Sequence, residues 1–325
     1  MMKVVLHLGA HKTASTYLQA RLGNSTNALA ARRVAFLGPE AVRETLARAG
    51  SLHHAQRPVA VMSRRRMGDA MARLIEGAAS DGAARAIISD EALLGRLTDV
   101  FDKADLFGSA RGRLKAFRRA LDGPDLDILI SIRGFAGFLP SVWSHMVLRR
   151  GYSPFDMGWA DRMLDAPRRW ADVVQDVASV FPKARLIVWR YEDLRLIEDD
   201  VLRAFAGDEG LSAIEPIQWQ ALAGLSAPAV TRLEEIMVEG TRPDRGRVQT
   251  VSRRFPKPKG HPAYRPFPPE KCRKMQSDYE NDLARIAGLD RVTLIRPEDQ
   301  FGKNVRKNAE ASQPAASATR IETMP

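Results

Sequence analysis

Residues 4–18 read Val-Val-Leu-His-Leu-Gly-Ala-His-Lys-Thr-Ala-Ser-Thr-Tyr-Leu. An apolar strand runs here into a small, hydroxyl-rich turn that carries one lysine, Lys12, and the turn leads into a helix. Backbone N–H groups at a helix start, the positive end of the helix dipole and a lysine ammonium all attract anions. The stretch therefore predicts a binding site for phosphate or sulfate groups in the turn at residues 9–16.

Runs rich in Val, Ile and Leu recur up to about residue 200 and alternate with helical stretches. The runs lack a clean apolar-polar alternation, as expected for strands buried on both faces. This order predicts an α/β fold with three layers, α/β/α, around a central, mainly parallel sheet. Ligands of such sheets bind beyond the carboxyl ends of the strands, where the turn at 9–16 falls. The expected strands are Lys3 to Leu8, Val34 to Leu37, Ala84 to Ser89, Asp127 to Ile132 and Arg185 to Arg190, and the expected helices include Ser15 to Ala31, Arg64 to Ala78, Leu139 to Arg150, Ala166 to Val180 and Glu270 to Ala287.

The 325 residues, 45% hydrophobic and 27% charged, can bury a substantial core. We predict one α/β domain over residues 1–302, helical from about residue 200, and a disordered tail over 303–325. No apolar stretch reaches the roughly 20 residues that a membrane span needs, and the N-terminal apolar run is too short for a secretory leader. With a single cysteine, Cys272, these features predict a cytoplasmic protein.

The formal net charge of +11 predicts an anionic partner. The sign of the charge fits nucleic acid, an acidic glycan, a membrane surface or a polyanionic cofactor equally well. Basic doublets and one triplet are scattered through the chain instead of being gathered in one arm, which favours solvated helix faces. We therefore expect no nucleic-acid partner.

The order of residues in the first turn narrows the ligand. An ordinary nucleotide-triphosphate loop reads G-x-x-x-x-G-K-[ST], whereas His11 precedes the lysine here and Leu6 stands at the first glycine position. The pattern G-x-x-K-T-A-S-T instead resembles the 5′-phosphosulfate loop of sulfotransferases, which hold 3′-phosphoadenosine-5′-phosphosulfate (PAPS). This resemblance implies a P-loop, sulfotransferase-like fold with cofactor contacts from His11, Lys12, Thr13, Ala14, Ser15 and Thr16. Ala14 replaces a customary glycine, and a positive φ there would cost about 1 kcal/mol.

A second feature supports the same family. The expected strand over residues 127–132 ends in Arg133, and Ser141 follows eight positions later in a helical stretch. A guanidinium offers paired donors to phosphate oxygens, and a helix-borne hydroxyl adds a third. In sulfotransferases an arginine and a serine at this spacing hold the 3′-phosphate of PAPS, so the resemblance assigns that role to Arg133 and Ser141.

A third match is the segment Tyr191-Glu192-Asp193-Leu194 after the fifth expected strand, since many sulfotransferases carry Y-E-D-L there. We interpret it as structural, with the two carboxylates capping the next helix. Tyr17, directly after the first turn, stands where relatives often place an aromatic residue near the adenine, although packing in the core explains it equally well. A basic C-terminal segment offers further phosphate contacts, with Arg253, Arg254, Lys257 and Lys259 as candidates.

The candidate base lies beyond the strand that ends at Ser89. Glu91 is our choice and Asp90 the second, because a carboxylate near the acceptor hydroxyl could remove its proton. The alternative is that both carboxylates cap the turn that follows. Of the histidines, His53 and His54 could fold over the acceptor, His7 fits a buried strand position, and His11 could contact the cofactor or substrate.

The resemblance implies a bacterial PAPS-dependent sulfotransferase that transfers a sulfuryl group to a hydroxyl or amine without a catalytic metal. Lys12 would neutralise the leaving phosphate, and Glu91 would take the acceptor's proton. The expected acceptor is a small molecule, a glycan or a lipid headgroup, with an anionic one favoured by the net charge. Two alternatives stay open: a nucleotide kinase or NTPase, since residues 87–91 also look like a Walker-B strand, and a non-catalytic module that binds polyanions.

Overall fold

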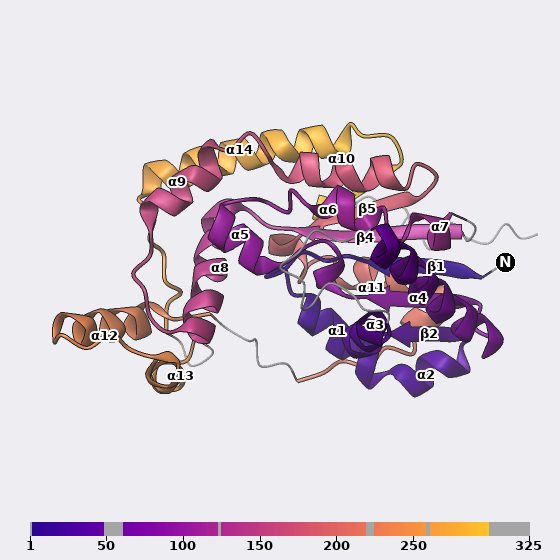
Figure 1. The fold of residues 1–325 in the computed structure, drawn as a ribbon, viewed down its shortest axis with the longest axis horizontal. Coiled ribbons are helices and arrows are strands. Elements are labelled where there is room, and N and C mark those ends of the chain that lie inside the picture. The colour runs from indigo at the N-terminus through magenta and orange to yellow at the C-terminus, as the bar shows by residue number, and fades with distance from the viewer. Residues whose placement is uncertain (1, 49–60, 123–124, 219–223, 258–260, 299–325) are drawn as a thin grey trace, which may run out of the picture.

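The computed structural model describes residues 2–48, 61–122, 125–218, 224–257 and 261–298 (Figure 1). The predicted tail at 303–325, the pair His53 and His54, and Lys259 lie outside the described residues.

A six-stranded sheet forms the centre of the fold, with strand order β2-β3-β1-β4-β5-β6 and every pair parallel. The five strands predicted from the sequence are present, and the α/β class is confirmed. The sixth strand lies in a part of the chain for which the sequence predicted helices. It is short and half-exposed at the sheet edge, so it lacks the long buried apolar run that marks the others. The strands are β1 (Lys3–His7), β2 (Val34–Leu37), β3 (Arg85–Ser89), β4 (Asp125–Ile132), β5 (Arg185–Arg190) and β6 (Val292–Ile295).

Helices surround the sheet, and four of the five helices expected from the sequence are present with both ends within four residues of the predicted positions. The helix expected over 15–31 is broken into two at Ser25. The helices are α1 (Ser15–Asn24), α2 (Thr26–Ala31), α3 (Pro39–Arg48), α4 (Val61–Ser80), α5 (Leu97–Lys103), α6 (Ala110–Leu114), α7 (Arg118–Leu121), α8 (Phe135–Arg150), α9 (Met157–Asp165), α10 (Trp170–Val180), α11 (Glu198–Leu211), α12 (Ala227–Val238), α13 (Arg245–Arg254) and α14 (Pro269–Ala287), with 3₁₀ turns η1 (Glu91–Leu93) and η2 (Tyr191–Asp193).

Each face of the sheet has its own hydrophobic core, because successive strand residues point to opposite faces. Val5, Ile87 and Leu129 pack with residues of α1, α2 and α11 on one face. Val4 and Ile128 belong to a larger cluster that includes residues of α4, α8, α10 and α14 on the other. The chain therefore has helical layers on both sides of a parallel sheet.

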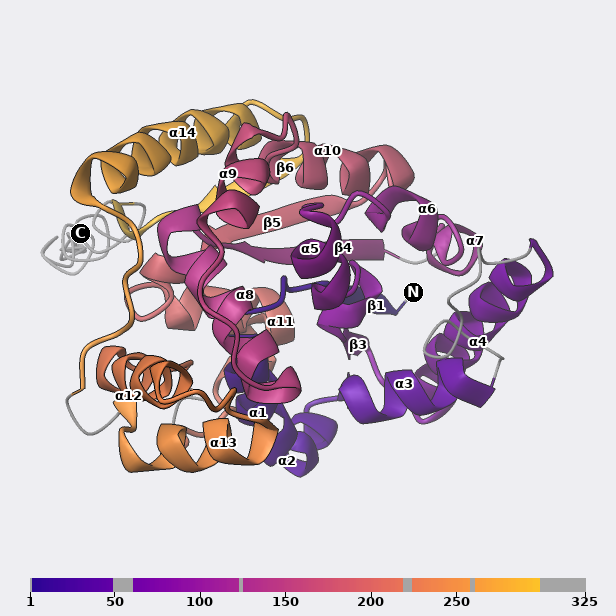
Figure 2. The ribbon, with the colours of Figure 1, turned by 60° about the vertical axis from the view of Figure 1, so that its left-hand side comes forward.

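The carboxyl ends of the strands lie on the left in Figure 1, where α8, α12 and α13 are found. Figure 2 brings this edge forward and shows α8 in front of it. The turn after β1 and the residues that follow β3, β4 and β5 all emerge at this edge. Within the described residues, no helix has the length and apolarity needed to cross a membrane.

The turn between β1 and α1 has an unusual backbone. Gly9, Lys12 and Ala14 have φ values of +55°, +69° and +67°. A methyl group on Gly9 would lie 2.4 Å from Ser15 Oγ, so glycine is required there. Ala14 is the N-cap of α1 in the left-handed conformation and makes no side-chain cap. Left-handed residues interspersed among others let successive N–H groups point into one concavity, which is an anion-binding geometry.

Replacing Ala14 by glycine should stabilise the protein. The left-handed backbone costs alanine about 1–2 kcal/mol, and the greater freedom of glycine in the unfolded chain offsets part of the gain. We expect Ala14→Gly to raise the free energy of unfolding by about 0.5–1 kcal/mol in urea titrations. The matched control, Ala20→Gly inside α1, should lower it by about 1 kcal/mol. A lower free energy of unfolding in Ala14→Gly would contradict the claim that the left-handed backbone strains Ala14.

Candidate functional site

The hydroxyl groups of the first turn serve two different purposes. Thr13 Oγ1 donates to the Ala10 carbonyl at 2.6 Å, and Ser15 Oγ donates to the same carbonyl at 3.3 Å. Both side chains are buried and hold the turn closed, whereas Thr16 is exposed. Among the described residues, the backbone N–H groups of residues 12–16 donate to no other backbone carbonyl. These donors, more than the Thr13 and Ser15 hydroxyls, are available to an anion.

Arg133, which the resemblance assigns to the 3′-phosphate, lies against this turn. Its Nη1 donates to the Lys12 carbonyl at 2.8 Å, and its guanidinium stands 4.2 Å from the centre of the Tyr191 ring. A methyl group on Gly137, in the first turn of α8, would lie 3.1 Å from Arg133 Nε. That Nε is buried and has no hydrogen-bond partner in the described part of the chain. A fixed guanidinium with an unused donor fits an anion at this place.

Lys257 joins the site from the other end of the chain. Its Nζ would be 3.6 Å from a methyl group on Gly224, which in turn would be 2.7 Å from Ser144 Oγ of α8. The Leu225 N–H also donates to Ser144 Oγ, which ties this segment to the helix. Of the basic C-terminal candidates that the structure describes, Lys257 is therefore the one at the site. Arg253 contacts Thr250 of its own helix, and Arg254 lies over Phe255.

We call the group Lys12, Arg133 and Lys257 the cation cluster. Its members influence one another electrostatically. Burial, followed by the charges of Arg133 and Lys257, lowers the pKa of Lys12 to about 8, and the carboxylate of Glu91 opposes the shift. Burial and the charge of Arg133 also lower the pKa of Lys257. Cations held close enough to repel one another favour the binding of an anion between them.

Ser141 lies one helical turn beyond Gly137 on α8, so both residues share one face of that helix. Since the Arg133 guanidinium lies against Gly137, the predicted pairing of Arg133 with Ser141 is compatible with the helix geometry. The serine is half-buried, and the described part of the chain offers its hydroxyl no hydrogen-bond partner.

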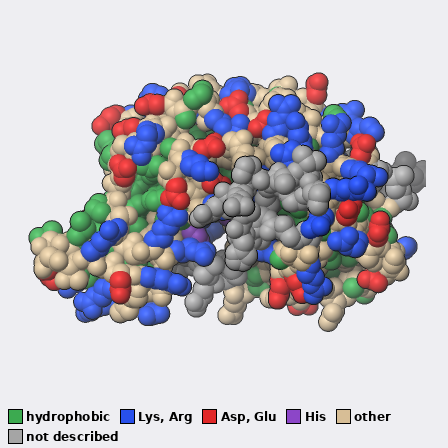
Figure 3. Space-filling view, in the orientation of Figure 1, with side chains coloured by type: hydrophobic (Ala, Val, Ile, Leu, Met, Phe, Trp, Pro, Cys, Tyr) green, Lys and Arg blue, Asp and Glu red, His purple; other side chains and the backbone are tan. Residues whose placement is uncertain are grey.

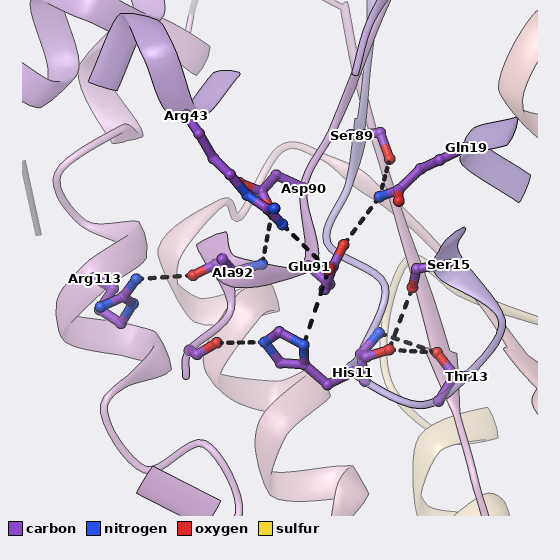
Figure 4. A network of polar contacts seen from close by, with 12 residues as sticks. His11, Thr13, Ser15, Gln19, Arg43, Ser89, Asp90, Glu91, Ala92 and Arg113 are labelled. Atoms are coloured by element: carbon purple, nitrogen blue, oxygen red, sulfur yellow. Dashed lines mark hydrogen bonds and ion pairs between the residues drawn. The ribbon is translucent and has the colours of Figure 1, made fainter. Parts of the chain in front are cut away.

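A second network surrounds the carboxylates that follow β3 (Figure 4). Glu91 Oε2 accepts from Gln19 Nε2 at 3.0 Å, and Glu91 Oε1 accepts from Arg43 Nη2 at 3.2 Å. The Nδ1 atom of His11 lies 4.0 Å from Glu91 Oε1, and its Nε2 is 3.0 Å from the Gly95 carbonyl. Burial raises the pKa of Glu91, but His11 and the Gln19 hydrogen bond outweigh it, so the pKa lies below its usual value.

Asp90 and Glu91 have separate roles. Asp90 is buried, caps η1 by accepting from the Ala92 N–H at 3.0 Å, and receives two hydrogen bonds from Arg43. The capping interpretation is thus correct for Asp90, whereas Glu91 points toward the first turn. Sequence reasoning missed Arg43 and Gln19. Gln19 could have been found, because it lies one helical turn after Ser15 at the start of α1.

The remaining sequence candidates are structural. His7 is fully buried and its Nδ1 is 2.8 Å from Ser89 Oγ, and burial lowers its pKa to about 4. The hydroxyl of Tyr17 donates to Glu198 at 2.5 Å, and its ring packs at the rim of the core that covers one sheet face. Glu192 accepts from the Gly134 N–H at 3.0 Å, so it supports the start of α8. The predicted cap on the helix that follows is wrong, since the N-cap residue of α11 is Ile197.

No protein-family model matches this chain, and a search of curated proteins gives no match.

The depressed pKa of Lys12 predicts how stability depends on pH. An unfolded lysine keeps a pKa near 10.5, so between pH 8 and 10.5 the unfolded chain binds more protons and rising pH favours the folded state. Lys12→Met removes the buried charge and should raise the free energy of unfolding at pH 7 by about 1–3 kcal/mol. In Lys12→Met, the part of the increase in unfolding free energy above pH 8 that comes from Lys12 should also be absent.

Urea unfolding from pH 7 to 10.5 measures both effects, with Lys183→Met, at an exposed lysine, as the matched control. The control should leave the stability at pH 7 within about 0.5 kcal/mol of the parent. If the parent protein and Lys12→Met were equally stable at pH 7, burial and the neighbouring cations would not be destabilising the Lys12 ammonium.

Proposed function

We propose that this protein is a PAPS-dependent sulfotransferase with a P-loop, sulfotransferase-like fold. The observation that carries the proposal is the convergence of Lys12, from the turn after β1, with Arg133, from the end of β4, on one turn. Among the described residues, the N–H groups of residues 12–16 in this turn donate to no backbone carbonyl. PAPS carries phosphate groups at both ends of its ribose, and the resemblance of both motifs to those of sulfotransferases supports this donor.

The residues divide between the two phosphate groups. The N–H groups of the turn, with His11, Lys12, Thr13, Ala14, Ser15 and Thr16, would surround the 5′-phosphosulfate, although the hydroxyls of Thr13 and Ser15 act through the turn itself. Arg133 and Ser141 would hold the 3′-phosphate. Lys257 is the basic C-terminal residue whose position supports a contact with the same group.

The reaction would be an in-line transfer of a sulfuryl group to a hydroxyl or amine, with the positive charge of Lys12 stabilising the phosphate that leaves. No catalytic metal is proposed. The sequence assigns to Glu91 the role of taking the acceptor's proton. Its carboxylate lies near His11 and the first turn, which supports a place for it in the site.

The acceptor we propose is a small molecule, a glycan or a lipid headgroup, with an anionic one favoured by the net charge of +11. Figure 3 shows Lys and Arg side chains spread over much of the visible face. A cytoplasmic location belongs to the same proposal.

The kinase alternative is disfavoured by one feature of the β3 end. A Walker-B carboxylate has to be available to a Mg²⁺ ion, whereas Asp90 gives both oxygens to Arg43 and one also to the start of η1.

Calorimetric titration with adenosine 3′,5′-bisphosphate tests the donor site. We expect binding by the parent protein and a loss of about 10–100-fold in affinity for both Lys12→Ala and Arg133→Lys, because each removes a charged hydrogen-bond donor or its paired geometry. Arg133→Lys is used because it keeps a cation beside Tyr191 and limits damage to the fold. Arg232→Ala, at an exposed arginine of α12, is the control. Undiminished affinity in both site variants would contradict the assignment.

Turnover separates the three function classes. With PAPS and a panel of phenols, sugars and phosphorylated alcohols, we expect release of adenosine 3′,5′-bisphosphate without added Mg²⁺, and the low pKa of Lys12 predicts a decline of donor affinity above about pH 8. Consumption of ATP that requires Mg²⁺, with indifference to PAPS, would establish a kinase or NTPase. Steeply salt-dependent binding of polyanions without turnover would establish a binding module.

A further inference from the structure

One face of α8 is polar and borders the cation cluster. Residues at intervals of four lie along one side of a helix, and on this side of α8 they are Gly137, Ser141, His145 and Arg149. Ser141 and His145 are half-buried and Arg149 is exposed. The rest of the helix is buried by large apolar residues, namely Phe138, Leu139, Val142, Trp143, Met146 and Val147.

Two members of the cation cluster lie beside this helix. The Arg133 guanidinium is packed at Gly137, and Lys257 lies beside Gly224, which touches Ser144, the neighbour of His145. His145 therefore stands one helical turn from Ser141 and two from Gly137, against which Arg133 packs. The charged or titratable groups that act on it are Lys12 and His11 from the first turn and Arg149 from its own helix.

His145 differs from the other proton acceptors near Lys12 because it is uncommitted. Both oxygens of Glu91 receive hydrogen bonds, and both nitrogens of His11 face partners, Gly95 and Glu91. Across the residues that the structure describes, the imidazole of His145 makes no hydrogen bond. Burial, then the charges of Lys12, Arg149 and His11, lower its pKa to about 4, so it is neutral at pH 7 and able to accept a proton.

We propose that the free imidazole of His145, and not the fully occupied carboxylate of Glu91, contacts the acceptor hydroxyl and takes up its proton. This inference rests on the proposed sulfotransferase function. The acceptor oxygen forms a bond to sulfur while the bond between sulfur and the bridging phosphate oxygen breaks. The hydroxyl proton moves to His145, and the electron pair of the broken bond stays on the phosphate, next to Lys12. Glu91 then acts as a positioning residue that orients His11.

The position of His145 can be tested without an acceptor. Its Cε1–H resonance, assigned with His145→Gln, should titrate near pH 4 in the free protein. Saturation with adenosine 3′,5′-bisphosphate places negative charge on the cation cluster and should raise this pKa by about 1 unit or more. An unchanged His145 titration in a protein that binds the bisphosphate would overturn the proposal.

Turnover tests the chemical role. With PAPS and an acceptor found in the panel, or with water as the acceptor, we expect His145→Ala to lower kcat about 100-fold or more while the bisphosphate affinity stays within about threefold of the parent. Added imidazole should restore activity to His145→Ala and not to Glu91→Gln, and the control Arg232→Ala should be unaffected. Parent-like kcat in His145→Ala, or loss of kcat without rescue by imidazole, would overturn the role. Failure of the parent protein to bind the bisphosphate would instead contradict the proposed function itself.

Discussion

The site depends on three cations that the fold holds buried and close together. Lys12, Arg133 and Lys257 come from segments far apart in the chain. Burial lowers the pKa of each, and the charge of Arg133 lowers those of Lys12 and Lys257 further. The folded state without an anion is destabilised by this arrangement, since buried like charges oppose one another. Such strain persists because the surrounding packing fixes the segments, and it is relieved when negative charge enters the cluster.

The order of the strands brings these groups together. In the sheet, β1 lies between β3 and β4, and β5 follows β4. The turn after β1 therefore has the residues beyond β4 on one side and those beyond β3 on the other. Arg133, from β4, contacts the Lys12 carbonyl, while Tyr191 and Glu192, beyond β5, support Arg133 and the start of α8. Four adjacent strand ends thus build one site.

The carboxylates of the site lie on one side of the first turn, and the cation cluster lies on the other. On the β3 side, Arg43 and Gln19 hold Asp90 and Glu91 in a closed network. On the β4 side, the described residues offer no hydrogen-bond partner to Arg133 Nε or to the imidazole of His145. A closed network stabilises a local geometry, whereas groups without partners are the ones available for binding and proton transfer.

The sequence by itself determined the α/β class, five of the six strands and the turn between β1 and α1, because these depend on local hydrophobic runs and on a short motif. It also singled out Arg133, because its place at a strand end, eight residues before Ser141, resembles a sulfotransferase motif. The tertiary structure decided what local pattern does not encode: that Asp90 and not Glu91 caps η1, that Lys257 is the C-terminal cation at the site, and that β6 joins the sheet. It also brought His145 within the electrostatic influence of Lys12. The physical reason is that these relations join segments more than a hundred residues apart, or depend on which hydrogen-bond partners remain free after the chain has packed.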